Sequence, residues 1–549
     1  MKKQLYKIGF VLMIAFLASC NDFADINVNP VRPTDLDPVN QLAYTQMRYS
    51  GDYVVPLRSA IGVTMPLLQQ MTGTFTNNSG ATYAYSESIY SFVWNNDFPG
   101  IVVNMVDAVE RTTGIANKTN LNAMCRIMKV MVFARLTDMY GDIPYSEAGK
   151  GYISLTMRPK YDEQKNIYND FFKELKESFT QLDASKDKVT QDQFFAGDIS
   201  KWKKLANSLR LRYAMRLAKV DPPKAKSETE AAYADGLIAS NADICLTKHE
   251  NVQSVGTEFR GNGLTGGMQA NPDPSRITTT MINLLKPENL TDPVDPRLNI
   301  ITRCYYPLSP LVTGPALLTR IDITDQVATY YSNLSGNNAM SGIFGIVPGS
   351  NTLAVNSPLV ADITINVPGL GNKIVAPKDQ RRQVANFMQQ FNTPAIHVSY
   401  SEIELLLAEA KVRGWNVGPD AAKTHYQNGI KANIEQLKLY TGAPAITGYD
   451  AFVSFKNLET GKELEQINTQ LYLTLFLNPL EGFANWRRSG FPVLLPVGTT
   501  GIPIPRRFQY PQNEIDQNKE NMGVAVARIL GIKGTGIDSY LNRVWWDKE

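Results

Sequence analysis

Long apolar segments are scarce in this 549-residue sequence. The run at residues 8–17 is half as long as the roughly 20 residues that a membrane-spanning helix needs. The longest later candidates, at residues 124–136 and 471–480, are interrupted by charged or polar residues. We therefore expect no transmembrane helix, and any attachment to a membrane must have another origin.

The short apolar run has the features of a lipoprotein signal peptide. Three lysines precede it, and Leu17-Ala-Ser-Cys20 follows, with small residues before the cysteine as a signal peptidase requires. An ordinary secretory signal or a buried N-terminal helix accounts for neither the lysines nor the position of the cysteine. The pattern predicts that residues 1–19 are removed and that Cys20 becomes a lipidated N-terminus.

Net charge is also lacking once this peptide is removed, because its three lysines account for the whole excess of 55 basic over 52 acidic residues. A neutral chain without a long Lys/Arg run lacks the electrostatic footprint of a protein that binds phosphate backbones. Nucleic acid is therefore not an expected partner. Highly charged polymers are weakly disfavoured as ligands, since local patches count for more than net charge.

Cysteine and histidine are few and scattered. With Cys20 lipidated, at most one disulfide can form from the remaining thiols, which have no C-x-x-C spacing: Cys125, Cys245 and Cys304. Cys125 lies in an apolar helical pattern, which favours a buried thiol. Packing or surface roles are favoured for the histidines, which are His249, His397 and His425. The sequence shows no EF-hand loop and no histidine cluster, so we predict neither a metal nor a cofactor.

Helical periodicity dominates the two ends of the chain. One apolar stripe has the alternating spacing of four and three residues that is typical of a helix, in Tyr168, Phe172, Leu175, Phe179 and Leu182. A helix through Met124 should end at Gly141, and Ser200 should cap a further helix. A helical hairpin is predicted later, with a capping box at Ser401 and Glu404 and a second helix that begins near Pro419.

The composition shifts between about residues 251 and 394 to Gly, Pro, Asn, Thr and Ser. Loops and short strands are expected there. A long irregular insertion is uncommon in a compact domain unless it is functional, and binding surfaces are often built on such segments. A merely tolerated insertion is the alternative. We favour a functional role.

Six phrases follow the lipidated cysteine in order and span nearly the whole mature chain: residues 23–30 (FADINVNP), 135–148 (RLTDMYGDIPYSEA), 201–216 (KWKKLANSLRLRYAMR), 295–298 (DPRL), 400–410 (YSEIELLLAEA) and 485–492 (NWRRSGFP). Together they resemble the SusD/RagB family of outer-membrane lipoproteins of Bacteroidetes-type bacteria. We interpret them as architectural. Asp142 should act as a cap or accept turn amides, and Arg487 and Arg488 should stack and pair with scaffold carboxylates.

The resemblance implies a mostly α-helical fold, with tetratricopeptide-like helix pairs as a scaffold at about residues 35–250 and 395–495, and the irregular insertion at 251–394. The whole of residues 20–549 would be one SusD-like domain. The resemblance further implies a non-enzymatic protein of the outer membrane, held by its lipid and facing the cell exterior. Such proteins bind oligosaccharides or peptides and deliver them to a SusC-like TonB-dependent transporter.

Ligand-contacting residues are expected in loops rich in aromatic rings, because the apolar face of a sugar packs on an aromatic face. The candidates fall in three segments: Phe75, Tyr83, Tyr85 and Trp94; Phe259 and Arg260; and Arg303, Tyr305 and Tyr306. Since aromatic residues make up 10% of the chain, most of them should instead be core. Trp94 in particular fits a buried position at the start of a helix.

Two other function classes remain open at this point. A surface enzyme would need a reactive constellation, but H-E-x-x-H, G-x-S-x-G and the Walker motif are missing. A pair of catalytic carboxylates would leave no trace in the sequence. A structural lipoprotein that binds other proteins would show protein contacts but no saturable binding of a glycan or peptide.

Overall fold

The computed structural model describes residues 36–73, 79–254, 256–270, 276–308, 319–334, 336–338, 340–349, 361–497, 501–533 and 536–549. Cys20, the phrase at residues 23–30 and Phe75 lie outside the described residues. Within them, no helix combines the length and the apolar character that crossing a bilayer requires.

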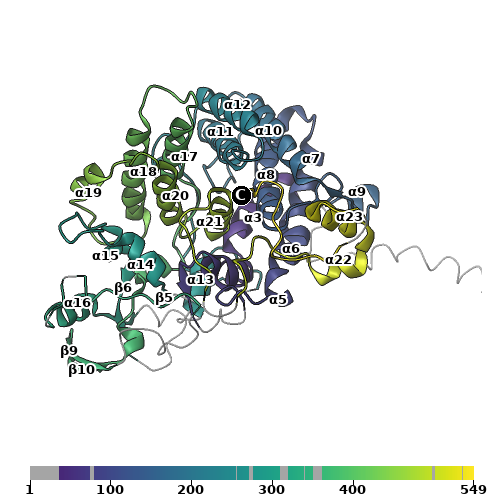
Figure 1. The fold of residues 1–549 in the computed structure, drawn as a ribbon. Coiled ribbons are helices and arrows are strands. Elements are labelled where there is room, and N and C mark those ends of the chain that lie inside the picture. The colour runs from purple at the N-terminus through teal and green to yellow at the C-terminus, as the bar shows by residue number, and fades with distance from the viewer. Residues whose placement is uncertain are drawn as a thin grey trace, which may run out of the picture.

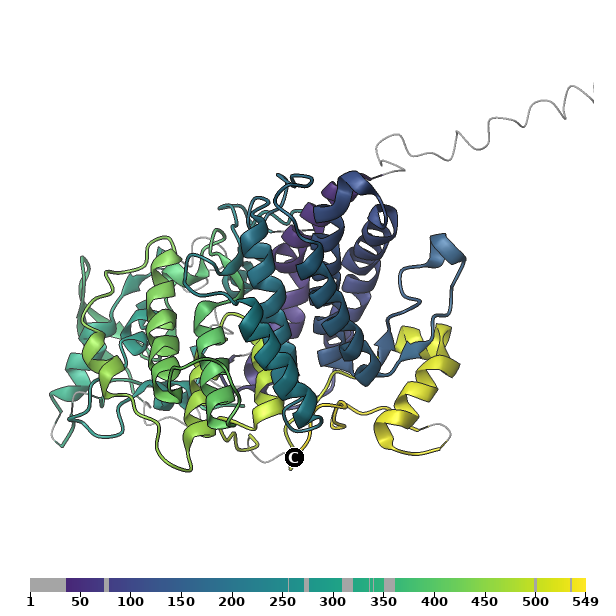
Figure 2. The same cartoon turned by 90° about the horizontal axis from the view of Figure 1, so that it is seen from above.

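Long helices build the larger part of the fold and pack mostly on their neighbours along the chain (Figures 1 and 2). The first group comprises α3 (Pro38–Gly51), α7 (Val103–Thr112), α8 (Thr119–Tyr140), α10 (Gln164–Gln181), α11 (Ile199–Arg216) and α12 (Pro222–Asp235). The second comprises α17 (Tyr400–Val412), α18 (Ala422–Gln436), α20 (Glu463–Thr474) and α21 (Pro479–Ser489). Helix α11 contacts α17, so the two groups form a continuous scaffold.

Shorter helical elements connect and cover the scaffold. They are η2 (Pro56–Thr64), α4 (Met65–Leu67), α5 (Glu87–Tyr90), α6 (Phe92–Asp97), η4 (Phe98–Val102), η5 (Ala116–Lys118), α9 (Gly151–Ser154), η8 (Pro377–Asp379), η9 (Asn386–Gln389), η10 (Leu437–Leu439), α19 (Asp450–Phe455), α22 (Gln512–Gln517) and α23 (Lys519–Leu530).

The helix boundaries test the sequence expectations directly. Helix α8 ends before Gly141, which has φ +89°, as predicted. Two predicted caps are wrong. Asp198 caps α11, and Ser399 caps α17 by accepting from the Glu402 amide at 3.0 Å. Each helix begins about two residues earlier than expected, so Ser200 and Ser401 lie inside the first turn, where they cannot act as caps.

The second helix of the predicted hairpin, α18, begins at Ala422, three residues after Pro419. Ser401 has a different role: its buried hydroxyl donates to the Gly429 carbonyl of α18 at 2.7 Å. Helices α17 and α18 therefore pair as predicted, through a polar contact that the capping interpretation did not foresee.

The middle of the chain holds short strands, as the composition predicts, and further short strands lie outside it. Four antiparallel strands form one small sheet in the order β1 (Met71–Thr72), β5 (Arg276–Ile277), β11 (Gln383–Val384) and β6 (Thr302–Arg303). Two-stranded antiparallel pairs complete the set: β2 (Ile143–Pro144) with β3 (Tyr161–Asp162), β4 (Cys245–Thr247) with β12 (Ala395–Val398), β7 (Tyr305–Tyr306) with β8 (Ile321–Asp322), and β9 (Ile363–Val367) with β10 (Gly371–Val375).

The same region also contains helices that the composition did not indicate: α13 (Gly263–Ala270), α14 (Thr279–Leu285), α15 (Arg297–Ile301) and α16 (Thr324–Ser332). The close packing of helix α13 explains why it contains glycines. A Cβ at Gly263 would lie 1.9 Å from the Asp52 carbonyl oxygen, and one at Gly267 would lie 2.9 Å from Ile61. The glycines therefore serve close packing of α13 on the end of α3 and on η2, and they do not mark a loop.

The family phrases form the polar interior of the scaffold. Arg488 donates to both carboxylate oxygens of Glu409 at 2.7 and 2.8 Å, and both side chains are buried. Arg487 lies over the Phe483 ring and donates to the Asp138 and Arg506 carbonyls at 2.6 and 2.8 Å. Among the residues that the structure describes, the predicted arginine–carboxylate pair forms at Arg488, whereas Arg487 binds backbone carbonyls instead.

Asp142 accepts from the Gln164 amide at 2.8 Å, as predicted, and also pairs with Arg528 at 2.6 Å. The C-terminal segment lies against the same interior, because the Trp546 indole donates to Asp138 at 3.0 Å. Figure 1 accordingly places the C-terminus near α8 and α21. The predicted fold class, mostly helical with an irregular portion of short strands, is confirmed.

Candidate functional site

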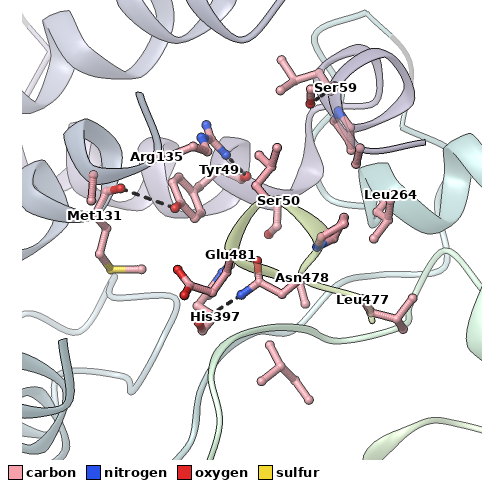
Figure 3. Close-up of a pocket in the computed structure, with 18 of the residues that line it drawn as sticks. Tyr49, Ser50, Ser59, Met131, Arg135, Leu264, His397, Leu477, Asn478 and Glu481 are labelled. Carbon is pink, nitrogen blue, oxygen red and sulfur yellow. Dashed lines mark hydrogen bonds between the residues drawn. The ribbon is translucent and has the colours of Figure 1, made fainter. Parts of the chain in front are cut away.

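A pocket of about 120 Å³ lies inside the scaffold, where α3, η2, α8, α11 and α13 approach β12 and the start of α21. Figure 3 shows its lining. Apolar side chains such as Val55, Met131 and Leu264 form part of the wall, and charged or polar groups face them. The polar groups that the argument below uses are Tyr49, Ser50, Arg135, Arg212, His397 and Glu481.

One wall is built on the contact between α3 and α8. The Arg135 guanidinium lies 4.0 Å from the centre of the Tyr49 ring and donates to the Tyr49 carbonyl at 2.9 Å. It also pairs with Asp97 at 2.6 Å. Burial raises the pKa of Asp97, and the attraction of Arg135 opposes that rise. Arg135 is thus held in place from three sides, with its charge balanced within the fold.

Another part of the lining carries a chain of buried charges. Arg212 donates to both carboxylate oxygens of Glu402 at 2.6 Å and to the His397 carbonyl at 2.6 Å. Glu481 pairs with Arg216 and lies 3.8 Å from Arg212. Burial alone would raise the pKa of Glu481, but the two arginines outweigh it and lower that pKa. Glu481 is therefore ionised at neutral pH.

Two histidines adjoin the pocket in their neutral form. Burial, with smaller contributions from His249, Arg212 and Arg135, lowers the pKa of His397 to about 3, and its Nε2 lies 2.8 Å from the Thr247 hydroxyl. Burial also lowers the pKa of His249 to about 4. The Nδ1 of His249 lies 3.0 Å from the Arg260 carbonyl, which can only accept, so Nδ1 carries the proton and Nε2 accepts from Ser50 at 2.9 Å.

This geometry suits a hydrated interior pocket. Its volume is below the roughly 300–1,000 Å³ of pockets that enclose drug-sized ligands, but it is ample for several water molecules. Its charged groups are already bound to one another. Within the described part of the chain, no group of three or more His, Cys, Asp or Glu side chains is arranged to hold a metal ion. An oligosaccharide would have to bind on the exposed surface instead.

Three of the predicted ligand residues are buried. Trp94 packs against the Phe98 and Tyr140 rings at 4.5 and 5.1 Å. The Tyr83 hydroxyl accepts from the Val497 amide at 3.1 Å, and the Tyr305 hydroxyl accepts from the Asn386 amide at 2.8 Å. Their rings stabilise the fold. This agrees with the expectation, based on the abundance of aromatic residues, that most of the rings belong to the core.

The other predicted residues are at least partly accessible and lie in three separate places. Tyr85 stacks on Tyr540 with ring centres 5.7 Å apart. Arg303, 3.5 Å from Asp322, lies on β6, and Tyr306 lies on β7, the next strand along the chain, which belongs to another sheet. Phe259 packs edge-on against Tyr44 at 5.8 Å, next to the exposed Arg260. Of these places, the Phe259 loop is connected to the pocket, through the Arg260–His249–Ser50 hydrogen bonds.

None of the eight described candidates lines the pocket, and the residues that do were not predicted as a site. Arg135 and Arg212 belong to the family phrases, so their presence was noted but interpreted as architecture. Tyr49, His397 and Glu481 come from three other segments and carry no local signal. Their convergence depends on the packing of α3, β12 and α21.

Comparison with known proteins identifies the family. The sequence profile described as "Starch-binding associating with outer membrane", of the SusD-like group, matches residues 39–511. A solved chitin-binding protein is 35% identical over 93% of this chain and 100% of its own, with a TM-score of 0.76. A SusD-like protein from Bacteroidetes is 33% identical over 94% of this chain and 100% of its own, with a TM-score of 0.80.

A more distant structure, a chitin-binding SusD homologue from Flavobacterium johnsoniae, is 21% identical over 93% of this chain and 97% of its own, with a TM-score of 0.64, and shows the shared fold. No curated protein matches the chain. The protein belongs to the SusD-like family, whose members are non-catalytic binding proteins associated with the outer membrane. The resemblance drawn from the six phrases is thereby confirmed, and the enzyme alternative is set aside.

Proposed function

We propose that this protein captures oligosaccharides at the cell surface and delivers them to a SusC-like TonB-dependent transporter, while a lipid on Cys20 holds it in the outer membrane. The observation that carries the proposal is the 35% identity, across nearly the whole chain, to a chitin-binding protein. Oligosaccharides of N-acetylglucosamine are therefore the first ligands to test. Starch oligosaccharides come second, because the family description names starch, and peptides third.

The accessible part of the predicted set supplies two candidate binding surfaces. The first surrounds Phe259, with the Tyr44 ring edge-on and the Arg48 guanidinium 5.2 Å from the Phe259 ring centre. The second is the segment of β6 and β7 that carries the partly accessible Arg303 and Tyr306. An aromatic ring beside a hydrogen-bond donor suits a sugar, which presents an apolar face and a rim of hydroxyl groups. We favour the first surface because Arg260, exposed beside Phe259 and paired there with Glu258 and Glu250, adds several charged groups that can bind sugar hydroxyls.

Capture is tested with the purified mature chain carrying Cys20→Ser. We expect depletion from solution by insoluble chitin, with saturation, and release by soluble chitin oligosaccharides. Phe259→Ala should weaken retention on chitin. Tyr85→Phe, a control at an aromatic residue outside this surface that retains its ring, should leave retention unchanged. If Tyr306→Ala weakens retention and Phe259→Ala does not, the second surface is the ligand site. Failure to bind chitin, starch or peptides would contradict capture and favour a protein-binding scaffold.

Delivery and anchoring are tested on the native protein. Extraction from the outer membrane in mild detergent should recover a large β-barrel transporter in stoichiometric amount. Mass spectrometry of the N-terminal peptide should show an acylated Cys20 and no trace of residues 1–19. Recovery of the protein alone would contradict delivery to a transporter, and an unmodified Cys20 would contradict the anchor.

A further inference from the structure

The connection between β2 and β3 projects from the scaffold and carries α9. Its base is fixed by the pairing of Ile143 with Asp162 and of Pro144 with Tyr161. The Asp162 carboxylate also accepts from the Ser146 amide at 2.8 Å. Figure 1 places α9 at the edge of the molecule near α23, and Figure 2 shows this blue segment standing clear of the helix layers.

The tip of this projection exposes large apolar side chains. Ile153 is 49% exposed, and Leu155 and Met157 are each 81% exposed. Leu155 also has φ +54°, a left-handed conformation that side chains other than glycine seldom adopt. Single exposed apolar residues are ordinary, but three on one short projection form a patch that marks a contact with another surface.

Basic residues flank the patch. Arg158 is exposed and forms no ion pair with any residue that the structure describes, while Lys150 and Lys160 pair at the surface with Glu110 and Glu147 at 3.4 and 3.3 Å. Two of the three cations are therefore paired, and beside the apolar tip the Arg158 guanidinium has no carboxylate partner among the residues that the structure describes. An apolar tip with cations around it is the combination that favours the interface of an anionic lipid bilayer.

Helix α23 supports the projection from one side. The Asn521 side chain donates to the Arg158 carbonyl at 3.1 Å, and that of Asn518 donates to the Pro159 carbonyl at 2.8 Å. Val524 lies one turn beyond Asn521 on the same helix and is 54% exposed, so it extends the apolar surface.

The projection starts close to where the described chain begins. The Leu36 carbonyl accepts from Arg111 at 2.6 Å, and the neighbouring Glu110 pairs with Lys150, at the start of α9. Both contacts are made by the last turn of α7. The seventeen residues from Cys20 to Leu36 span at most about 55 Å when fully extended. A lipid on Cys20 can therefore lie in the same membrane that the tip touches.

The geometry points to a membrane-contacting tip: the side chains of Ile153, Leu155 and Met157 rest in the headgroup region of the outer membrane and orient the domain on it. A lipid surface suits this patch better than a protein partner, because stable protein interfaces bury about 800 Å² on each side, more than so short a tip can offer. The inference rests on the lipid anchor of the proposed function.

The test uses the acylated protein in vesicles of phosphatidylethanolamine with an equal amount of phosphatidylglycerol, part of it carrying a nitroxide quencher. A fluorophore is attached to Leu155→Cys. The matched control is Ile374→Cys, which is 66% exposed on β10 at the other end of the molecule. We expect strong quenching at position 155 and little at 374. Equal quenching at both positions, or none at 155, would overturn the inference.

Two further measurements separate the possible causes of failure. The mass of the labelled protein shows whether Cys20 is acylated, so a missing anchor is distinguished from a tip that stays in water. Leu155→Ser with Met157→Ser should abolish the orientation but leave chitin binding unchanged. If position 155 is protected from the quencher only when the transporter is added, the tip docks on the transporter, and the lipid contact is wrong.

Discussion

Replacing Glu409 with glutamine should destabilise the protein strongly. The buried Glu409 carboxylate accepts both arms of Arg488, and Arg413 lies 2.8 Å away. Burial alone would raise the pKa of Glu409, but the two guanidinium groups outweigh it and lower that pKa from 4.5 to about 2. A lowering of this size corresponds to about 3 kcal/mol in the free energy of unfolding. Removing one partner of a buried ion pair costs about 3–5 kcal/mol, which agrees.

The pH dependence gives this prediction a sign. Because the pKa of Glu409 is lower in the folded than in the unfolded state, its contribution is complete above pH 4.5 and is lost as the pH falls toward about 2. By pH 3 about 2 kcal/mol of it should be gone. Urea unfolding followed by tryptophan fluorescence at pH 7 and pH 3 measures the difference between wild type and Glu409→Gln.

The matched control is Glu459→Gln, which removes a pair with Lys462 in which both side chains are more than half exposed. This change should cost less than about 1 kcal/mol. If Glu409→Gln costs no more than the control at pH 7, or if its cost does not shrink at pH 3, the buried pair does not support the scaffold as described.

Three further predictions follow from burial. Because the pKa of His397 is lowered to about 3 in the folded protein, the unfolded state binds a proton at a higher pH than the folded state does. As the pH falls from 7 to 5, His397 should therefore reduce the free energy of unfolding by about 2 kcal/mol. Urea unfolding of His397→Asn should show that this loss is removed. Gly263→Ala should lower the free energy of unfolding by about 1–3 kcal/mol, measured by urea unfolding. Gly266→Ala in the same helix should be tolerated, because its Cβ would lie 3.6 Å from the Phe391 ring. Iodoacetamide should label no thiol of the native mature protein, since burial raises the pKa of each, and should label all of them after unfolding: Cys125, Cys245 and Cys304. Parallel pH curves for wild type and His397→Asn, equal effects of the two glycine variants, or native labelling would each refute the corresponding argument.

Much of the fold was predictable because its signals are local. The apolar stripe of α10 and the glycine after α8 depend only on neighbouring residues, and both agree with the structure. The caps at Ser200 and Ser401 were wrong because a capping motif does not by itself fix the first helical residue. Helix α13 was missed because its glycines look like a loop until the close approach of Asp52 is known.

The pocket was not predictable, because its residues become neighbours only through packing. Tyr49 and Glu481 are more than 400 positions apart, and both face the same pocket. The aromatic candidates show that the exposure of a side chain also could not be predicted from the sequence. Trp94 and Tyr306 are alike in sequence character, but one is buried among rings and the other is partly accessible. Composition predicts how many rings a chain holds and leaves their exposure to the tertiary structure.

The most direct test of the central claim is calorimetric titration of the purified mature chain with chitin oligosaccharides, with the sugar recovered afterwards and its mass measured. The account predicts saturable binding, a loss of affinity in Phe259→Ala, and an unchanged ligand mass. Absence of heat with chitin, starch and peptide ligands alike, or a shortened sugar, would contradict a non-catalytic protein that captures oligosaccharides.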